Sequence, residues 1–370
     1  SFVLDYTDTS HSEKHFVEKV IHHAKVNAIY KELPAKLISP EIITSAIFSL
    51  EAIQNREPHI GPWLIYKEMK KNGVFVSIDG HGGDETITGY HHYPNYALKD
   101  ALWPWQINRW RDIQNVIQGL YEKEDELEFG LLPFFPSRGQ MLKSFFSKDR
   151  ITATVKQQLQ DSPALYNIIR SVSRNLRSMT KQKPLNNEWL KVLPADPLSL
   201  KSHSLVGNNA DNLNRQLYHD FHFGCLTQFH RNYDRDSMAH GVEIRAPFLD
   251  WRLVAFSFSL PSSSKLGDGY TKRILREAMK NILPDSIRLR KSKIGFASPM
   301  VEWYMSSLKE FVLDSINSQD FLESHIWNGP HIKHYTEQCY SKKDYVNATK
   351  SWKFIQAMIL MQKFKMFANK

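Results

Sequence analysis

A short apolar run that ends in a glycine-rich, acidic turn constrains the fold of this chain more than any other feature. The sequence from 73 to 93 reads GVFVSIDGHGGDETITGYHHY. Its apolar part, 74–78, predicts a fully buried strand of a parallel sheet. After Asp79 come residues that allow a tight turn and add two carboxylates: Gly80, Gly82, Gly83, Asp84 and Glu85. Ligands bind at the carboxyl ends of strands in open α/β sheets, so this turn is a candidate site. The glycines alone fit a plain strand-to-helix turn equally well.

The chain before this turn alternates strands and helices. We expect strands at 1–5 and 27–33, and helices at 13–26, from Pro40 and at 61–71. Two of these helices have an apolar face, formed by Phe16, Val17, Val20, Ile21 and Ala24 and by Ile43, Ala46, Ile47 and Leu50. Alternation of this kind predicts parallel strands with right-handed βαβ connections, and therefore an α/β fold.

The sequence pattern predicts that the rest of the chain is mainly helical. Residues 96–205 predict a helical insertion with mobile loops, because several prolines break its periodicity. We expect helices at 212–233 and 250–260, the second with Leu253, Val254 and Phe256 toward a core, and a helical tail from Val301 with a break at 327–329. This predicts three parts: an α/β core at 1–95, the insertion at 96–205 and a helical part at 206–370.

Composition narrows the class of protein. No apolar run is long enough to span a bilayer and no signal peptide is visible, which predicts a soluble cytoplasmic protein without a membrane partner. Cys225 and Cys339 form neither a metal spacing nor a disulfide framework. The net charge is +9, but the basic residues are dispersed, so we expect anionic ligands rather than nucleic acid.

A second informative segment lies far downstream, between 231 and 299. It contains RNYDRDSMAHGVEIRAPFLDWRLVAF, GDGYTKRILREAMKNILP and RLRKSKIGFASP. Together with SIDGHGGDE, these runs resemble the synthetase domain of the asparagine synthetase family, which includes the β-lactam synthetases and the lasso-peptide macrolactam synthetases. Members carry SGEGxDE, DRxSMAxGxExRxPFLDxRLV and an RxKxGF-like run. The resemblance implies an α/β fold with a parallel-sheet core of the ATP-pyrophosphatase (adenine nucleotide alpha hydrolase-like) type and large helical additions. It implies that the core at 1–95 binds the nucleotide and that the helical part at 206–370 completes the active site.

The resemblance also implies an activity, an ATP-dependent carbon–nitrogen ligase that uses ATP and Mg²⁺. Such an enzyme adenylates the carboxylate of a small molecule or peptide, releases pyrophosphate and lets an amine attack. The residues that the resemblance places along the nucleotide are Leu4, Asp79, Gly80, Gly82 and Gly83. Asp84 would be the magnesium ligand, since Mg²⁺ prefers oxygen ligands; a helix N-cap is the other interpretation.

Lys293 is the leading catalytic candidate. It lies in a dense basic cluster at 288–293, and it occupies the position of the family's essential lysine. A lysine there would stabilise negative charge on the reacting phosphate. A solvated basic loop is the alternative. We expect Asp234, Arg235, Glu243 and Arg245 to pair near buried surface, and Thr271, Lys272 and Arg276 to support the fold.

Three departures from the family matter. The SGGxDS pyrophosphate loop and the glutaminase domain are not in this sequence, so we expect an N-terminal fragment or partner chain to supply them, or else a non-catalytic homologue. His81 replaces the family's glutamate, and a histidine can act as the base for the amine. The GHGGD run resembles some lasso cyclases, which favours a macrocyclase or lactam-forming enzyme as an alternative. No arginine for a free aspartate α-carboxylate is evident at 57–61.

Overall fold

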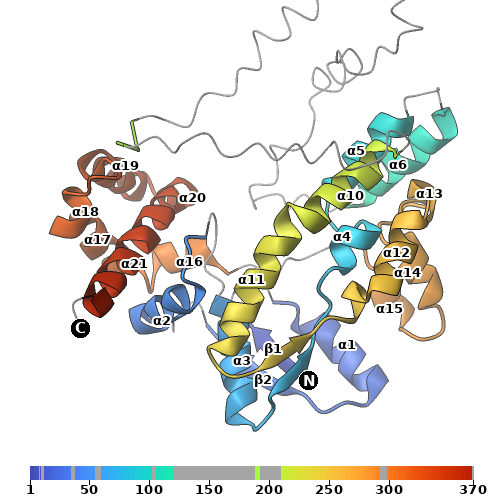
Figure 1. The fold of residues 1–370 in the computed structure, drawn as a ribbon, viewed down its shortest axis with the longest axis horizontal. Helices are drawn as coiled ribbons and strands as arrows, with labels where there is room; N and C mark the ends of the chain where they lie inside the picture. Colours follow the sequence, from blue (N-terminus) through green and yellow to red (C-terminus); the bar gives the residue numbers. More distant parts are fainter. Residues whose placement is uncertain are drawn as a thin grey trace, which may run out of the picture.

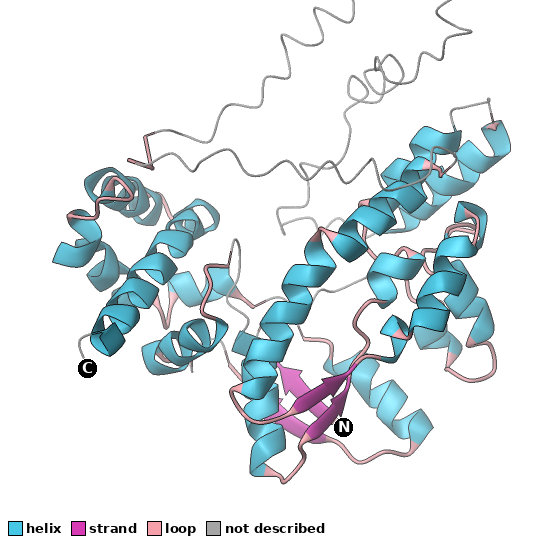
Figure 2. Ribbon diagram, in the orientation of Figure 1, coloured by secondary structure: helices cyan, strands magenta, loops and turns pink. Residues whose placement is uncertain are grey.

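Two short parallel sheets and many helices make up the protein (Figure 2). The computed structural model describes residues 1–7, 9, 12–34, 38–54, 60–101, 106–120, 188–191, 210–291 and 298–368. None of the helices in these ranges is both long and apolar enough to cross a membrane. The predicted α/β class is therefore confirmed at the level of a mixed, helix-rich fold with parallel strands.

The elements follow the predicted alternation in the first part of the chain. They are β1 (Phe2–Asp5), α1 (Lys14–Ala24), β2 (Ile29–Glu32), α2 (Pro40–Leu50), α3 (Ile60–Lys71), β3 (Val76–Ile78), α4 (Gly83–Ile87), α5 (Tyr93–Ala101) and α6 (Ile107–Leu120). β1 pairs in parallel with β2, with Phe2 opposite Ile29. The expected strands and helices up to residue 71 are thus confirmed to within a few residues.

The second half is helical apart from one strand. Its elements are α10 (Asn212–His222), α11 (Cys225–Met238), β4 (Glu243–Arg245), η6 (Pro247–Leu249), α12 (Trp251–Ser259), α13 (Ser262–Lys265), α14 (Arg273–Ala278), α15 (Asp285–Arg288), α16 (Met300–Met305), α17 (Lys309–Asn317), α18 (Gln319–Leu322), α19 (Gly329–Ser341), α20 (Tyr345–Ala348), η7 (Thr349–Ser351) and α21 (Trp352–Ala368). β4 pairs in parallel with β3, with Val76 opposite Glu243. The predicted helix at 212–233 is broken at Gly224, where a Cβ would lie 2.7 Å from the Asp220 Cα.

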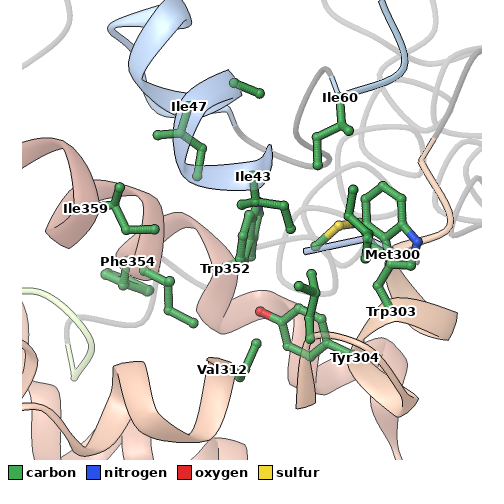
Figure 3. Packing of buried hydrophobic residues seen from close by; sticks show 14 of the residues in the cluster. Ile43, Ile47, Ile60, Met300, Trp303, Tyr304, Val312, Trp352, Phe354 and Ile359 are labelled. Carbon is green, nitrogen blue, oxygen red and sulfur yellow. The ribbon is translucent and has the colours of Figure 1, made fainter. Parts of the chain in front are cut away.

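The largest hydrophobic cluster joins the two ends of the chain. α2 begins at Pro40 after the N-cap Ser39, and its apolar face is fully buried as predicted. This face packs with residues of α16, α17 and α21, among them Trp303, Val312 and Trp352 (Figure 3). Figure 1 shows the blue α2 beside the red α21. The helical tail, with its break at Trp327 to Gly329, is confirmed and is part of this core.

A second cluster lies around α5, α6 and α10. Tyr93 and Ala97 of α5 pack with Ile113 of α6 and Leu213 of α10. Most of the predicted insertion, including its loops, falls outside the described residues, and the proposed division at 95 and 205 stays a prediction.

Three predictions of burial are wrong. β3 is exposed rather than fully buried: Ile78 is 76% and Val76 42% exposed, and they lie on the same face of the sheet as the exposed side chains of Glu243 and Arg245. On α12, Leu253 and Phe256 are 38% and 52% exposed, so this helix does not direct them into a core. On the predicted apolar face of α1, Ala24 is exposed and the other four residues are half-buried, although the Arg290 guanidinium lies over the Phe16 ring, 3.7 Å from its centre.

Candidate functional site

The carboxyl end of β3 positions Asp79 at the centre of a polar cluster. The Asp79 amide donates to the Arg245 carbonyl of β4 at 2.9 Å, which fixes the backbone at the point where the strand ends. Its carboxylate accepts hydrogen bonds from Tyr66 of α3, at 2.6 Å, and from Ser77. Burial and then this hydrogen bond raise the pKa of the Tyr66 hydroxyl, so it remains protonated and donates to Asp79 at neutral pH.

His81 lies against the same carboxylate. Its Nδ1 is 3.8 Å from Asp79 Oδ2, and its ring meets Tyr233 of α11 edge-on at 4.2 Å between ring centres. His230, one turn earlier on α11, is 6.0 Å away. Burial lowers the pKa of His230. The arrangement therefore holds one imidazole between a carboxylate and a phenol ring.

Close packing and backbone conformation favour glycine at one position of the turn, Gly82, whereas Gly83 has room for a Cβ in ordinary van der Waals contact. Gly82 has φ +86°, and a Cβ there would lie 2.2 Å from Leu249 Cδ2. A Cβ on Gly83 would meet the Phe248 ring at 3.5 Å, whereas one on Gly80 would meet nothing within 4 Å. The turn from β3 is thus pressed against η6, which follows β4. The PFLD run of the downstream block is what forms this contact.

Asp84 follows the turn and is paired with a lysine. Its Oδ1 lies 2.5 Å from the Nζ of Lys272. Gly89 gives the carboxylate room, because a Cβ on Gly89 would lie 1.7 Å from Asp84 Oδ1. Asp84 is not a helix N-cap residue, because the N-cap residue of α4 is Gly82. Glu85 is turned inward instead, 2% exposed, and accepts from the Tyr90 hydroxyl at 2.6 Å.

The donor set fits Mg²⁺ held together with a phosphate-bearing substrate. No cluster of three or more histidine, cysteine or acidic side chains that could hold a metal occurs among the described residues. Mg²⁺ is commonly held by one or two carboxylates and completed by substrate phosphates and water. Asp84, with its neighbouring Lys272, and Asp79 offer carboxylate oxygens at this edge, which is enough for that type of site and too little for a metal cage.

Leu4 is the predicted site residue that the described structure does not bring into this cluster. Leu4 is half-buried in β1 and packs against the large core. Lys293 falls outside the described residues. The positions flanking it are described: Lys291 Nζ lies 5.7 Å from the Tyr270 ring centre, and the Ser298 hydroxyl is 3.4 Å from that of Tyr6, just after β1.

Sequence reasoning missed three residues of the cluster. Tyr66, Tyr233 and Lys272 reach it from helices or loops distant in sequence, and Tyr233 was signalled only by its place in the RNYDRDSMA run. Arg276 supports the fold as expected, donating to the Thr271 carbonyl at 2.7 Å.

Charge pairing in the downstream block differs from the prediction. Arg235 pairs with Glu51 and Arg245 with Glu243, each at 3.0 Å, but both pairs are exposed rather than near buried surface. The buried acid of this block is Asp236.

Comparison with known proteins places the chain in a family. The family model described as asparagine synthase matches residues 1–363, so the chain belongs to the asparagine synthase family. It is 26% identical over 159 residues to asparagine synthetase (glutamine-hydrolyzing) 1 of Bacillus subtilis strain 168, a match that covers 43% of this chain and 24% of that protein.

Two shorter matches have a higher sequence identity. The chain is 40% identical over 81 residues to asparagine synthetase (glutamine-hydrolyzing) 3 of the same Bacillus strain, covering 22% of this chain and 13% of that protein. It is 32% identical over 120 residues to the Gallus gallus asparagine synthetase (glutamine-hydrolyzing), covering 30% and 21%. The matches span less than a quarter of each relative's own length.

Proposed function

We propose that this protein is an ATP-dependent amide-forming ligase that adenylates a carboxylate, releases pyrophosphate and admits an amine to the activated acyl group. The observation that carries the proposal is the cluster of Asp79, His81 and Asp84 at the carboxyl ends of parallel strands, in a chain of the asparagine synthase family. We further propose that its core is of the ATP-pyrophosphatase type and that Mg²⁺ accompanies the nucleotide.

The residues of the cluster would have different roles in the reaction. Bound Mg²⁺ would supply charge neutralisation on the phosphates, with Asp84 as its ligand. The backbone of the turn at 79–83, with Leu4 on the neighbouring sheet, would line the nucleotide. Tyr66 holds the Asp79 carboxylate, which in turn orients His81. His81 would take the proton of the attacking amine, and Lys293 would face the charge that develops on the phosphate.

Replacing Lys293 tests the assignment. We expect Lys293→Ala to lower carboxylate-dependent ATP turnover at least ~100-fold, because removal of one preorganised charge partner in a transition state costs about 3 kcal/mol or more. The matched control is Lys291→Ala, which removes the same charge from the same basic cluster. Equal activity of the two variants would show that 288–293 is a solvated loop.

The pH dependence tests His81. If neutral His81 accepts the amine proton, amide formation falls as the pH drops through the His81 pKa, because the protonated imidazole cannot accept. We expect His81→Gln to remove this acidic limb from the rate profile at unchanged folding. A wild-type profile that is flat across neutral pH contradicts the role.

A second candidate, closure of an amide ring within one substrate, is favoured by His81 in place of the family's glutamate. The substrate would then be a peptide or lactam precursor that carries its own amine. Turnover that is independent of added ammonium and of glutamine would distinguish ring closure from ammonia-dependent synthesis.

A further inference from the structure

A short extended segment, 188–191, lies against the helices at the C-terminal end of the chain. Its Leu190 is opposite Trp327 in an antiparallel bridge. Two backbone hydrogen bonds flank this bridge: the Lys191 amide donates to the Ile326 carbonyl at 2.9 Å, and the Asn328 amide donates to the Trp189 carbonyl at 3.1 Å. This docked segment therefore pairs like an added strand with the loop between α18 and α19. Figure 1 shows it in green beside α19.

The two central side chains of the docked segment are apolar and half-buried. The Trp189 ring meets Tyr335 of α19 edge-on, with 4.9 Å between ring centres, and lies 5.7 Å from Phe354 of α21. Leu190 packs against the same large hydrophobic cluster. The flanking residues Glu188 and Lys191 are exposed. The segment is thus held by its middle, through one aromatic and one aliphatic side chain.

The charged ends of the docked segment differ in their contacts. The Lys191 Nζ donates to the Ser324 carbonyl at 2.7 Å, in the loop between α18 and α19. Glu188 Oε2 lies 3.8 Å from His331 Nε2, and both side chains are exposed, so this pair contributes little. The contacts with the C-terminal helices therefore select an aromatic residue, an aliphatic residue and a cation, in that order.

The surface that receives the segment keeps its shape through contacts of its own. The Ser324 hydroxyl accepts from the amides of Ile326 and Trp327, at 3.2 and 3.4 Å. The indole of Trp327, 2% exposed, donates to the Phe321 carbonyl at 3.0 Å. A Cβ on Gly329 would lie 2.3 Å from that carbonyl oxygen, so α19 begins close against α18. None of these contacts uses the docked segment, which indicates a preformed binding surface.

The docked segment connects two parts of the fold. α6 and α10 belong to the second hydrophobic cluster, where Ile113 and Leu213 are fully buried. The segment lies between these two helices in the sequence, yet it packs against the largest cluster, together with α19 and α21. Its docking therefore ties the stretch of chain between α6 and α10 to the C-terminal helices.

We propose that the loop between α18 and α19, with Tyr335 and Phe354, forms a docking site for a linear peptide segment of the order Trp–aliphatic–Lys. Its occupant is the chain's own segment 188–191, which acts as a strap that binds reversibly. The contacts are few and half-exposed, so the strap can leave while the helices stay folded. Covalent attachment compensates for the small contact, because a tethered segment binds at a high effective concentration. This docking does not depend on the proposed ligase activity.

A separate peptide with the sequence of the strap tests the docking site. The probe is fluorescein-labelled NNEWLKVL, the sequence of 186–193, and the receptor is the full chain with Trp189→Ala and Leu190→Ala. We expect saturable binding to this double variant in fluorescence anisotropy, and at least ~10-fold weaker binding to the wild type, whose own segment occupies the site. The same peptide with Trp189→Ala should bind the double variant at least ~10-fold more weakly, because it loses the contacts with Tyr335 and Phe354.

Two tyrosine variants of the receptor make the result specific. Tyr335→Ala, added to the double variant, should weaken peptide binding at least ~10-fold. The matched control is Tyr345→Ala, which removes a half-buried tyrosine whose ring packs on Tyr340 instead and should leave binding unchanged.

Several outcomes would overturn the proposal. They are equal binding of the two peptides, no saturable binding to the double variant, and equal binding to the double variant and the wild type. Loss of helical circular dichroism in the double variant would show that the segment is an integral part of the core. A dimer that the wild type forms and the double variant loses would assign the site to the segment of a second copy, and would overturn the intramolecular occupant.

Discussion

Gly82 shows how a single residue fixes the turn at the end of β3. It combines φ +86° with contact to Leu249, so both its backbone and the space around it favour glycine. We expect Gly82→Ala to lower the free energy of unfolding by about 1–3 kcal/mol, measured by urea denaturation. Gly80→Ala is the control, because its Cβ meets nothing within 4 Å. Equal losses in the two variants would contradict this packing.

His240 gives a residue-scale prediction on pH. Burial, aided by Lys67 and Lys70, lowers its pKa from 6.5 to about 4, and its ring lies 4.6 Å from that of Trp63. Above pH 6.5 the histidine is neutral in both the folded and the unfolded chain. Between 6.5 and 4 the unfolded chain gains a proton that the folded one does not, so stability is lost as the pH falls.

The expected size of this loss is about 2–3 kcal/mol, from the free energy of the pKa shift. Urea unfolding of the wild type and of His240→Gln at pH 7 and pH 4 isolates it, because carboxylate titrations are common to both proteins. The wild type should lose more stability than the variant over this range. Parallel losses would contradict the buried neutral state of His240.

At the residue scale, the sequence was enough to predict the site residues that directly follow β3. Asp79, His81 and Asp84 follow β3 directly, so strand and turn patterns place them without knowledge of the fold. Tyr66 and Lys272 lie 13 and 188 positions from their partners Asp79 and Asp84, and reach them through packing alone. No local pattern encodes such a pairing.

At the scale of elements, helices with their own buried face were predicted best. α2 carries a proline at its start and four apolar residues at helical spacing, and all four are buried. β3 and α12 carry equally apolar residues, yet these are exposed. Apolarity predicts that a face will be covered, but the covering element has to be present for burial to occur.

A buried amide network links the segment after α2 to α11 and α21, and it allows a prediction at this scale. The side chain of Gln356 in α21 accepts from the Gln54 backbone N–H at 3.1 Å and donates to the Gln54 backbone carbonyl at 3.0 Å. The Gln54 side chain also donates to and accepts from the side chain of Asn232. We expect Gln356→Leu to lower the free energy of unfolding by about 2–4 kcal/mol, because two buried backbone groups lose their partners.

The control for this prediction lies on the same helix. Gln362 bonds to Asp320 in an exposed position, so Gln362→Leu should change stability by less than about 0.5 kcal/mol. Denaturant unfolding measures both. A Gln356→Leu variant as stable as its control would show that the network does not hold α21 to the rest of the molecule.

At the scale of the whole molecule, the core explains why distant parts of the sequence belong together. The cluster around Trp303 and Trp352 joins α2 to the helical tail, while β3 and β4 join the turn at 79–84 to the downstream block. The family match over residues 1–363 agrees with this continuity. The parallel order of these strands was predictable from alternation; their pairing as two separate sheets in the described chain was not, because it depends on contacts between segments far apart in sequence.

The central claim is ATP-dependent activation of a carboxylate, and carboxylate-dependent ATP–pyrophosphate exchange tests it most directly. The experiment screens small-molecule and peptide carboxylates with Mg²⁺, using the wild type and Lys293→Ala, each alone and together with an N-terminal fragment that carries an SGGxDS loop. The account predicts exchange with at least one carboxylate when the fragment is present, and its loss in Lys293→Ala. No exchange in either form, together with no Mg²⁺-dependent binding of ATP, would contradict the account and identify a non-catalytic member of the family.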